Sequence, residues 1–301
     1  MDGRLGAMMS RNARILCEGI YFGEGPRWRE GRLWFSDFYA RAVKSVSLAG
    51  DVRTELALDD DAPSGLGWTP DGSLLVVSMA KRRVLRRAPD GAVTVHADLS
   101  GVATFLANDM VVDAAGGAYV GDFGFDLHDE LLERGEMSVF ADHPATRLAR
   151  VAPDGAVTVA AEDMHFPNGS MITPDGKTLI VGETLGARLT AFDIGADGTL
   201  SGRRVWAQTW PRIPDGACLD AAGAVWIANP LAPECARLAE GGAVLDSVAT
   251  SQNCFACMLG GDDGETLFMM TAPSSIPAIA SAKPAGRIEI APAESPHAGR
   301  P

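Results

Sequence analysis

The sequence lacks any run of 18 apolar residues, and its first nine residues contain no apolar stretch of the kind found in secretory signals. A transmembrane helix needs about 20 apolar residues, so we expect no membrane span and no membrane partner. The missing signal predicts a cytoplasmic protein.

Cysteine is also scarce, with five residues in 301, and an odd number cannot pair completely into disulfides. Cys254 and Cys257 form a lone C-x-x-C. A zinc site would need a second such pair, and a redox motif would need a βαβ setting that the sequence does not show. The cysteines are therefore interpreted as reduced thiols, buried or incidental to function.

Several catalytic signatures are absent, among them G-x-S-x-G, H-E-x-x-H, the phosphate-binding G-x-x-x-x-G-K-[ST] and a dinucleotide fingerprint. Positive charge is also in deficit, because 26 Lys and Arg face 39 Asp and Glu, which gives a net charge of −13. Such an acidic chain is a poor partner for nucleic acid. Part of the acidity could instead serve a cation.

What the sequence does contain is a repeat. A small or polar residue is followed seven or eight positions later by a turn glycine and then by a short hydrophobic strand. The glycines lie 41, 44, 60, 47 and 41 residues apart. The repeat glycines are Gly31, Gly72, Gly116, Gly176, Gly223 and Gly264.

A period in the forties with several short strands per unit is typical of propellers with four-stranded blades. Helical periodicity is nearly absent, and 47% hydrophobic residues are ample for a core. We predict an all-β, six-bladed β-propeller over residues 11–290, with disordered segments at 1–10 and 291–301. A strand near Ala13 to Cys17 should close the ring by pairing with the last blade near Arg287 to Ile290.

The 60-residue step contains an insert at about 122–147. Leu127, Leu131 and Leu132 indicate one or two helical turns that end at Gly135. Long insertions in compact β domains are often lids or binding loops, and a surface loop without function is the alternative.

Equivalent positions of successive blades lie on one ring around the propeller axis. The repeated position should therefore bring two carboxylates and two amides to the same end of the central channel. Two unpaired carboxylates would repel each other there, and a divalent cation would remove that cost. Oxygen donors select hard cations, and we favour calcium, with magnesium, manganese, zinc and iron(II) as alternatives. A polar channel without a metal remains the competing interpretation. The ring positions are Glu24, Ser64, Asn108, Asn168, Asp215 and Ala256.

Four short sequence motifs around these positions resemble those of the family of the senescence marker protein, gluconolactonase and the luciferin-regenerating enzyme, which are six-bladed propellers. They are Gly23-Glu24-Gly25-Pro26-Arg27-Trp28, Asn108-Asp109, Phe166-Pro167-Asn168-Gly169-Ser170 and Ile213-Pro214-Asp215-Gly216-Ala217. The resemblance spans about Glu18 to Ile290. It implies one divalent metal held by Glu24, Asn168 and Asp215, with Asn108 beside the site, and an activity towards lactones.

The sequence departs from that family at one informative place. Sugar lactonases of the family often carry an arginine two residues before the asparagine, where this chain has Leu106, and a glycine after the Asn-Asp pair, where it has Met110. A leucine cannot grip sugar hydroxyls, so the substrate is expected to be less polar than gluconolactone. Substrate contacts are assigned to Asn108, Leu106 and Phe166.

The resulting hypothesis is a metal-dependent lactonase, a hydrolase that opens a lactone ring. Asp215 is the candidate general base and Asn108 orients substrate or water. His128 and His165 lie near the rim, where one could relay a proton or both could simply be exposed. A phosphotriesterase-like hydrolase and a non-catalytic calcium-binding or interaction propeller remain as alternatives. The expected partner is a small lactone, and the protein should be a monomer or a small homo-oligomer.

Overall fold

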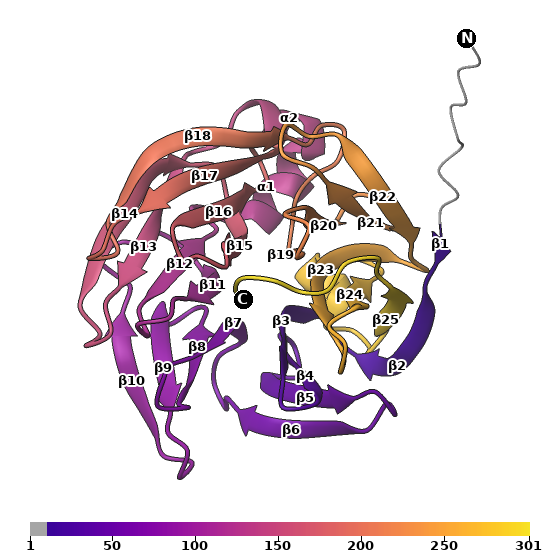
Figure 1. The fold of residues 1–301 in the computed structure, drawn as a ribbon, viewed down its shortest axis with the longest axis horizontal. Helices are drawn as coiled ribbons and strands as arrows, with labels where there is room; N and C mark the ends of the chain where they lie inside the picture. Colours follow the sequence, from indigo (N-terminus) through magenta and orange to yellow (C-terminus); the bar gives the residue numbers. More distant parts are fainter. Residues whose placement is uncertain (1–10) are drawn as a thin grey trace.

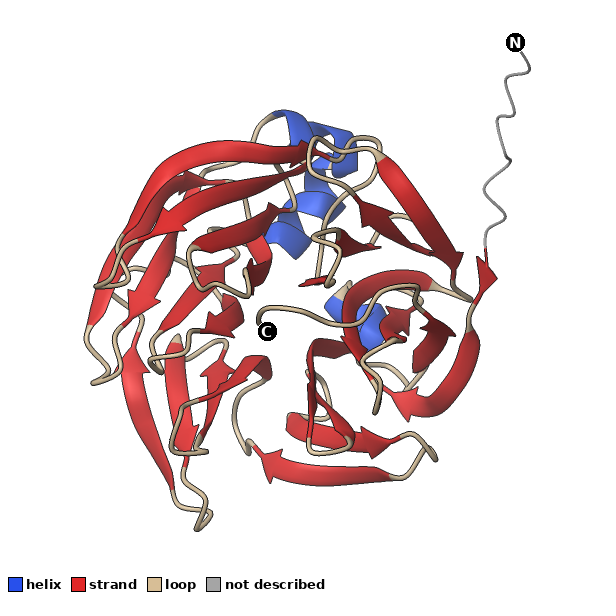
Figure 2. Ribbon diagram, viewed as in Figure 1, coloured by secondary structure: helices blue, strands red, loops and turns tan. Residues whose placement is uncertain are grey.

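The computed structural model describes residues 11–301 as a ring of six antiparallel sheets around a central channel (Figure 1). Figure 2 shows that strands make up the ring and that helices occur only in its connections. Blades 1 to 3 consist of β3 (Gly23–Arg29), β4 (Arg32–Asp37), β5 (Ala42–Ser47) and β6 (Val52–Ala57); of β7 (Pro63–Trp68), β8 (Leu74–Ser78), β9 (Arg83–Arg87) and β10 (Val93–Asp98); and of β11 (Ala107–Val112), β12 (Ala118–Asp122), β13 (Thr146–Val151) and β14 (Val157–Met164).

Blades 4 to 6 continue in the same order, from the innermost strand outwards. They consist of β15 (Pro167–Ile172), β16 (Thr178–Glu183), β17 (Arg188–Ile194) and β18 (Leu200–Gln208); of β19 (Ala217–Leu219), β20 (Val225–Asn229), β21 (Glu234–Leu238) and β22 (Val244–Ala249); and of β23 (Asn253–Gly260), β24 (Thr266–Ala272), β25 (Gly286–Pro292) and β2 (Arg14–Ile20). The predicted six-bladed fold is thereby confirmed.

The ring closes as the sequence predicts, because β2 supplies the outer strand of blade 6. Arg14 lies opposite Ile290 and Cys17 lies opposite Ile288 in an antiparallel pair with β25. A short strand, β1 (Arg11–Asn12), adds to β22 of blade 5 in parallel. The chain start thus joins two blades, and β2 covers the edge of β25 that would otherwise be open to another chain. The expected disorder of residues 1–10 lies outside the described residues.

The core fills the spaces between neighbouring blades. Phe35 of blade 1, Trp226 of blade 5 and Phe268 of blade 6 belong to one buried cluster. Second strands such as Leu74–Ser78 are buried throughout, which explains their continuous hydrophobic sequences.

The insert forms two helices, α1 (Leu127–Arg134) and α2 (Glu136–Ala141), between β12 and β13. The Asp126 side chain caps α1 by accepting a hydrogen bond from the Asp129 N–H, and Gly135 ends it at φ 78°. The predicted helical turns and their stop are confirmed, whereas α2 was not predicted. A third helix, α3 (Pro277–Ala280), is a single turn. No helix within residues 11–301 has both the length and the apolar character needed to span a membrane.

The C-terminal segment differs from the prediction. Residues 291–301 were expected to be disordered, but Arg300 and Ile172 exchange both backbone hydrogen bonds, and the Ala298 N–H donates to the Leu219 carbonyl. The Arg300 side chain also reaches the Val112 carbonyl, at 3.3 Å. The segment thus leaves blade 6, passes blades 5 and 4, and ends at the centre of the ring (Figure 1). It has no strand pattern because its partners are the distant ends of inner strands.

Candidate functional site

A local irregularity in the inner strands aims the ring positions into the channel. In blades 1 to 4 the pairing of the innermost strand with its neighbour shifts register at the repeated polar residue. Such bulges turn side chains out of the regular ladder. Gly25 shows the backbone requirement, because it follows Glu24 with φ 55°. The shifts span Glu24 to Arg27, Pro63 to Leu66, Ala107 to Met110 and Pro167 to Ser170.

The sixth ring position was predicted incorrectly as Ala256. The register shift in β23 lies between Cys254 and Ala256, so the residue turned into the channel is Phe255. Phe255 lines the cavity, with its ring centroid 4.8 Å from that of Phe22, whereas Ala256 is buried in the core between blades. Counting back eight positions from the turn glycine could not show this, because Phe255 lies nine residues before Gly264.

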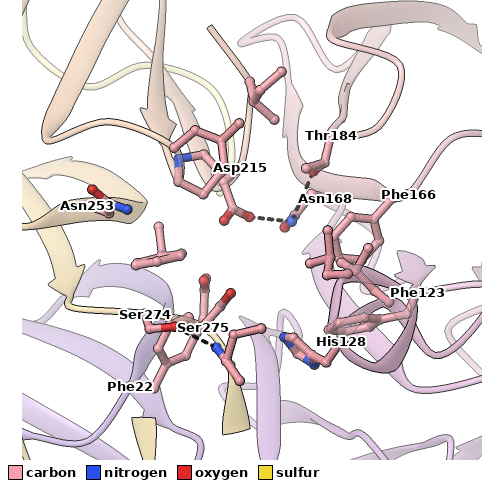
Figure 3. A pocket seen from close by; sticks show the side chains of 18 of the residues that line it. Phe22, Phe123, His128, Phe166, Asn168, Thr184, Asp215, Asn253, Ser274 and Ser275 are labelled. Atoms are coloured by element: carbon pink, nitrogen blue, oxygen red, sulfur yellow. Dashed lines mark hydrogen bonds between the residues drawn. The ribbon is translucent and has the colours of Figure 1, made fainter. Parts of the chain in front are cut away.

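A cavity of about 430 Å³ opens at the end of the channel where the inner strands begin (Figure 3). The three predicted ligands, Glu24, Asn168 and Asp215, line it together with Asn108 and Phe166. The channel therefore brings the polar ring residues of four blades to one cavity, as the sequence predicts. Phe166 comes from the loop just before β15, where it adopts φ 57°.

Leu106 is not among the described lining residues, so the expected substrate contact is not supported. It packs in the apolar cluster behind the cavity wall, and its carbonyl accepts a hydrogen bond from the Phe123 N–H at 2.9 Å. Phe123 itself lines the cavity. Leu106 thus supports the wall from behind, whereas Asn108, in the bulge of β11, lines the cavity.

Asn168 and Asp215 face each other across the boundary between blades 4 and 5 (Figure 3). The Asn168 amide nitrogen donates to a carboxylate oxygen of Asp215 and lies 3.4 Å from the Thr184 hydroxyl, which donates to the Pro214 carbonyl at 2.9 Å. The Asn168 amide and the Asp215 carboxylate therefore meet in the cavity. Rotation of the amide by 180° would present its oxygen there instead.

Gly169 explains how blades 4 and 5 come so close. Its N–H donates to the Asp215 carbonyl at 3.2 Å. A Cβ atom at this position would lie 2.4 Å from the Ala217 nitrogen and 2.6 Å from the Asp215 carbonyl oxygen. Only glycine allows this approach, so the Asn-Gly pair of the repeat sets the spacing between two of the predicted ligands.

The surroundings of the cavity carboxylates disfavour their ionised form. Burial raises the pKa of Glu24 well above its ordinary value, and the charges of Asp215 and Asp109 raise it further. Burial and the charge of Asp109 likewise raise the pKa of Asp215, although the hydrogen bond from Asn168 acts in the opposite direction. Glu24 keeps some accessible surface, and it lines the cavity.

One buried arginine lies behind these carboxylates, a feature that the sequence interpretation missed. Arg27 is 5% exposed and pairs with Asp109 at 3.0 Å. Its guanidinium also donates to the carbonyls of Leu66 at 3.0 Å and Met110 at 2.6 Å, so it joins the inner strands of blades 1, 2 and 3. Its position three residues after Glu24 could have indicated that this arginine lies near the ring.

The donor set fits a hard divalent cation. Three ionised carboxylates, Glu24, Asp109 and Asp215, and one guanidinium would leave two negative charges, which a divalent ion would balance. Within the described residues no three His, Cys, Asp or Glu side chains form a metal-binding group, so the remaining donors would be amides. Glu24, Asp215 and the Asn168 oxygen supply the carboxylate and carbonyl ligands that calcium and magnesium prefer.

The two rim histidines have different surroundings. His128, on α1, lines the cavity, and burial lowers its pKa. His165 is not among the described lining residues; its Nδ1 lies 2.8 Å from Nε2 of His143, whose Nδ1 donates to the Val139 carbonyl at 2.9 Å. Of the pair, His128 alone is placed to meet a ligand.

The cysteines lie away from the cavity surface. Cys254 and Cys257 are buried free thiols between blades 5 and 6, in one cluster with Cys218 and Cys235. Cys257 Sγ lies 3.5 Å from the Gly216 carbonyl, directly behind Asp215. Their burial agrees with the interpretation of the C-x-x-C as part of the core.

A family model described as the SMP-30/Gluconolactonase/LRE-like region matches residues 22–273. Regucalcin of Gallus gallus is 26% identical over 274 residues, which cover 87% of each chain. Pentonolactonase XacC of Haloferax volcanii is 25% identical and covers 86% of this chain and 84% of its own. A calcium-binding regucalcin structure from Agrobacterium tumefaciens superposes with a TM-score of 0.75 at 22% identity, covering 98% and 99%, which supports the fold.

Proposed function

The chain belongs to the SMP-30/gluconolactonase/LRE-like family, and on that basis we propose that it is a metal-dependent hydrolase that opens the ring of a lactone less polar than gluconolactone. The observation that carries the proposal is the meeting of Glu24, Asn168 and Asp215 at the base of one cavity. Similarity to a pentonolactonase supports the reaction class.

Glu24, Asn168 and Asp215 would hold one divalent cation, with calcium favoured by the all-oxygen donors. Such an ion polarises an ester carbonyl and lowers the pKa of a bound water. The Asp215 carboxylate accepts a hydrogen bond from the Asn168 amide in this cavity, and it would hold the proton that an attacking water loses.

Asn108 is the candidate for orienting the substrate. Its side-chain oxygen accepts a hydrogen bond from the Ser64 hydroxyl at 3.1 Å, which fixes the amide and leaves its nitrogen free to donate. A lactone oxygen is an acceptor that this nitrogen could bind. Phe166 would pack against the substrate from the neighbouring wall.

The test is a comparison of the wild-type protein with Asp215→Ala. The variant is expected to lose both stoichiometric metal, measured by plasma mass spectrometry, and turnover in a pH-stat assay. Glu240→Ala, which removes an exposed carboxylate far in sequence from the ring positions, is the matched control and should retain both. Turnover that survives the loss of the metal would contradict the mechanism.

Substrates for this assay should be sugar, aliphatic and aromatic lactones and a phosphotriester, each with and without chelator. Preferential, chelator-sensitive hydrolysis of the phosphotriester would favour the phosphotriesterase alternative. Metal binding without turnover of any substrate would favour a non-catalytic calcium-binding propeller.

A further inference from the structure

The cavity holds a disproportionate share of the aromatic residues of the chain. Of eleven phenylalanines in the sequence, six line this one cavity. Tyr39 and the α1 residues Leu127 and Leu131 add to the apolar surface. The phenylalanines are Phe22, Phe38, Phe123, Phe140, Phe166 and Phe255. Most of the surface above the polar base is therefore hydrocarbon.

These rings form two walls on opposite sides of the ring of blades. Phe22 of blade 1 lies with its centroid 4.8 Å from that of Phe255 of blade 6. Phe123, which follows β12 of blade 3, lies 4.7 Å from Phe166, which precedes β15 of blade 4. Figure 3 shows Phe123 and Phe166 together on one side and Phe22 on another, with Asp215 and Asn168 between them.

The cavity offers no fixed positive charge beyond a cation at its base. None of its described lining residues is a lysine or an arginine, whereas Glu24, Glu136 and Asp215 are acidic. His128 contributes no charge at neutral pH, because burial lowers its pKa. A substituent carrying a carboxylate or phosphate would find no counter-ion here, and burying an unpaired charge is costly.

Polar side chains on the upper walls are few and lie together. Asn253, Ser274 and Ser275 line the cavity from blade 6 (Figure 3). The Ser274 hydroxyl is already engaged, since it accepts from the Ile276 N–H at 3.1 Å. A polyhydroxylated ring would thus lose its hydration to walls that return few hydrogen bonds.

From this arrangement we propose that the substrate of the lactonase is an uncharged lactone that carries an aryl or alkyl group on its ring. The ester group lies at the polar base formed by Glu24, Asn168 and Asp215, and the hydrocarbon group lies between the phenylalanine walls beneath α1. This inference rests on the proposed function for the reaction, and it names the substrate class. A volume of about 430 Å³ is that of a small-molecule site.

The experiment uses two matched series on the calcium-loaded protein. The first consists of γ-lactones whose ring substituent lengthens from hydrogen to octyl, with a phenyl member and glucono-δ-lactone. The second consists of the corresponding lactams, which resist hydrolysis and report binding by calorimetry. Each added methylene should tighten lactam binding and raise kcat/KM about fourfold until the cavity is filled. Glucono-δ-lactone should fall at least roughly 100-fold below the octyl lactone in kcat/KM.

Two variants localise the effect. Phe123→Ala should weaken binding of the longest lactam roughly tenfold, and the loss should grow with substituent length. Phe192→Ala is the matched control, because Phe192 is equally buried but lies in a different cluster. Leu131→Gln, at a partly exposed position of α1, repeats the test if Phe123→Ala does not fold.

The two proposals fail separately. Turnover of small or sugar lactones with a flat lactam series would refute the substrate class and leave the hydrolase standing. A steep lactam series without turnover of any lactone would refute the hydrolase and leave the hydrocarbon-binding cavity. A length dependence that Phe192→Ala changes as much as Phe123→Ala would overturn the assignment to the phenylalanine walls.

Discussion

Removal of the metal should make the stability of the protein fall as pH rises. Burial and the charges of neighbouring carboxylates raise the pKa of Glu24 and of Asp215 in the native state. Above the ordinary range of carboxyl pKa values, the unfolded chain releases these protons while the metal-free native state retains them. The native state then binds more protons than the unfolded state, so the free energy of unfolding decreases with increasing pH.

The size of the effect follows from linkage. Each group that is protonated only in the native state lowers the free energy of unfolding by about 1.4 kcal/mol per pH unit. The range from pH 6.5 to 8 is the informative one. Below it, His128, whose pKa is lowered by burial, and three similar histidines give the opposite slope, since they are protonated only when unfolded. We expect the negative slope of these carboxyl groups to be visible in this range, because burial raises their pKa values well above the ordinary ones.

The assay is urea unfolding of chelator-treated protein at constant ionic strength, repeated with saturating calcium. Calcium should remove the slope, because both carboxylates are then ionised and paired. Asp215→Asn should flatten the metal-free slope and raise stability, whereas Glu240→Gln, with the same charge change on the surface, should not. Metal-free stability that stays constant or increases between pH 6.5 and 8 would refute the reasoning.

Three further predictions concern the scaffold, each measured by urea unfolding. Arg27→Met leaves Asp109 buried without its partner and should cost about 3–5 kcal/mol; a loss below about 1 kcal/mol would show that the pair is dispensable. Gly169→Ala places a Cβ 2.4 Å from a backbone nitrogen, so it should cost about 1–3 kcal/mol and weaken calcium binding by displacing Asp215, which calorimetry would detect. Deletion of residues 293–301 removes hydrogen bonds to blades 3, 4, 5 and 6 and should cost about 2–3 kcal/mol, and unchanged stability would show that these bonds contribute nothing measurable.

The blade repeat could be predicted because its signals are local. Turn glycines and short hydrophobic strands recur within each unit, and they give the number of blades and the closing pair of β2 with β25. The same register predicts that Glu24, Asn168 and Asp215 share one end of the channel, where the structure places them. Whether they hold a metal stays a prediction.

The features that could not be predicted depend on contacts between distant segments. The bulge that presents Phe255 in place of Ala256 is one residue shorter than its counterparts, and spacing alone does not show this. Leu106 packs in the apolar cluster behind the cavity wall and does not line the cavity. The path of residues 293–301 depends on backbone pairing with Ile172 and Leu219, and the pattern of side chains in the sequence does not predict such pairing.

The path of the C-terminal segment affects how ligands reach and leave the cavity. The segment crosses the mouth opposite the cavity, where Arg27, Arg300 and Pro301 line a second pocket. We therefore expect ligands of the cavity to enter and leave beside α1 and Leu231. In the proposed reaction, the bulky acid that ring opening produces would have to leave before the next substrate binds, so product release could limit the rate of turnover.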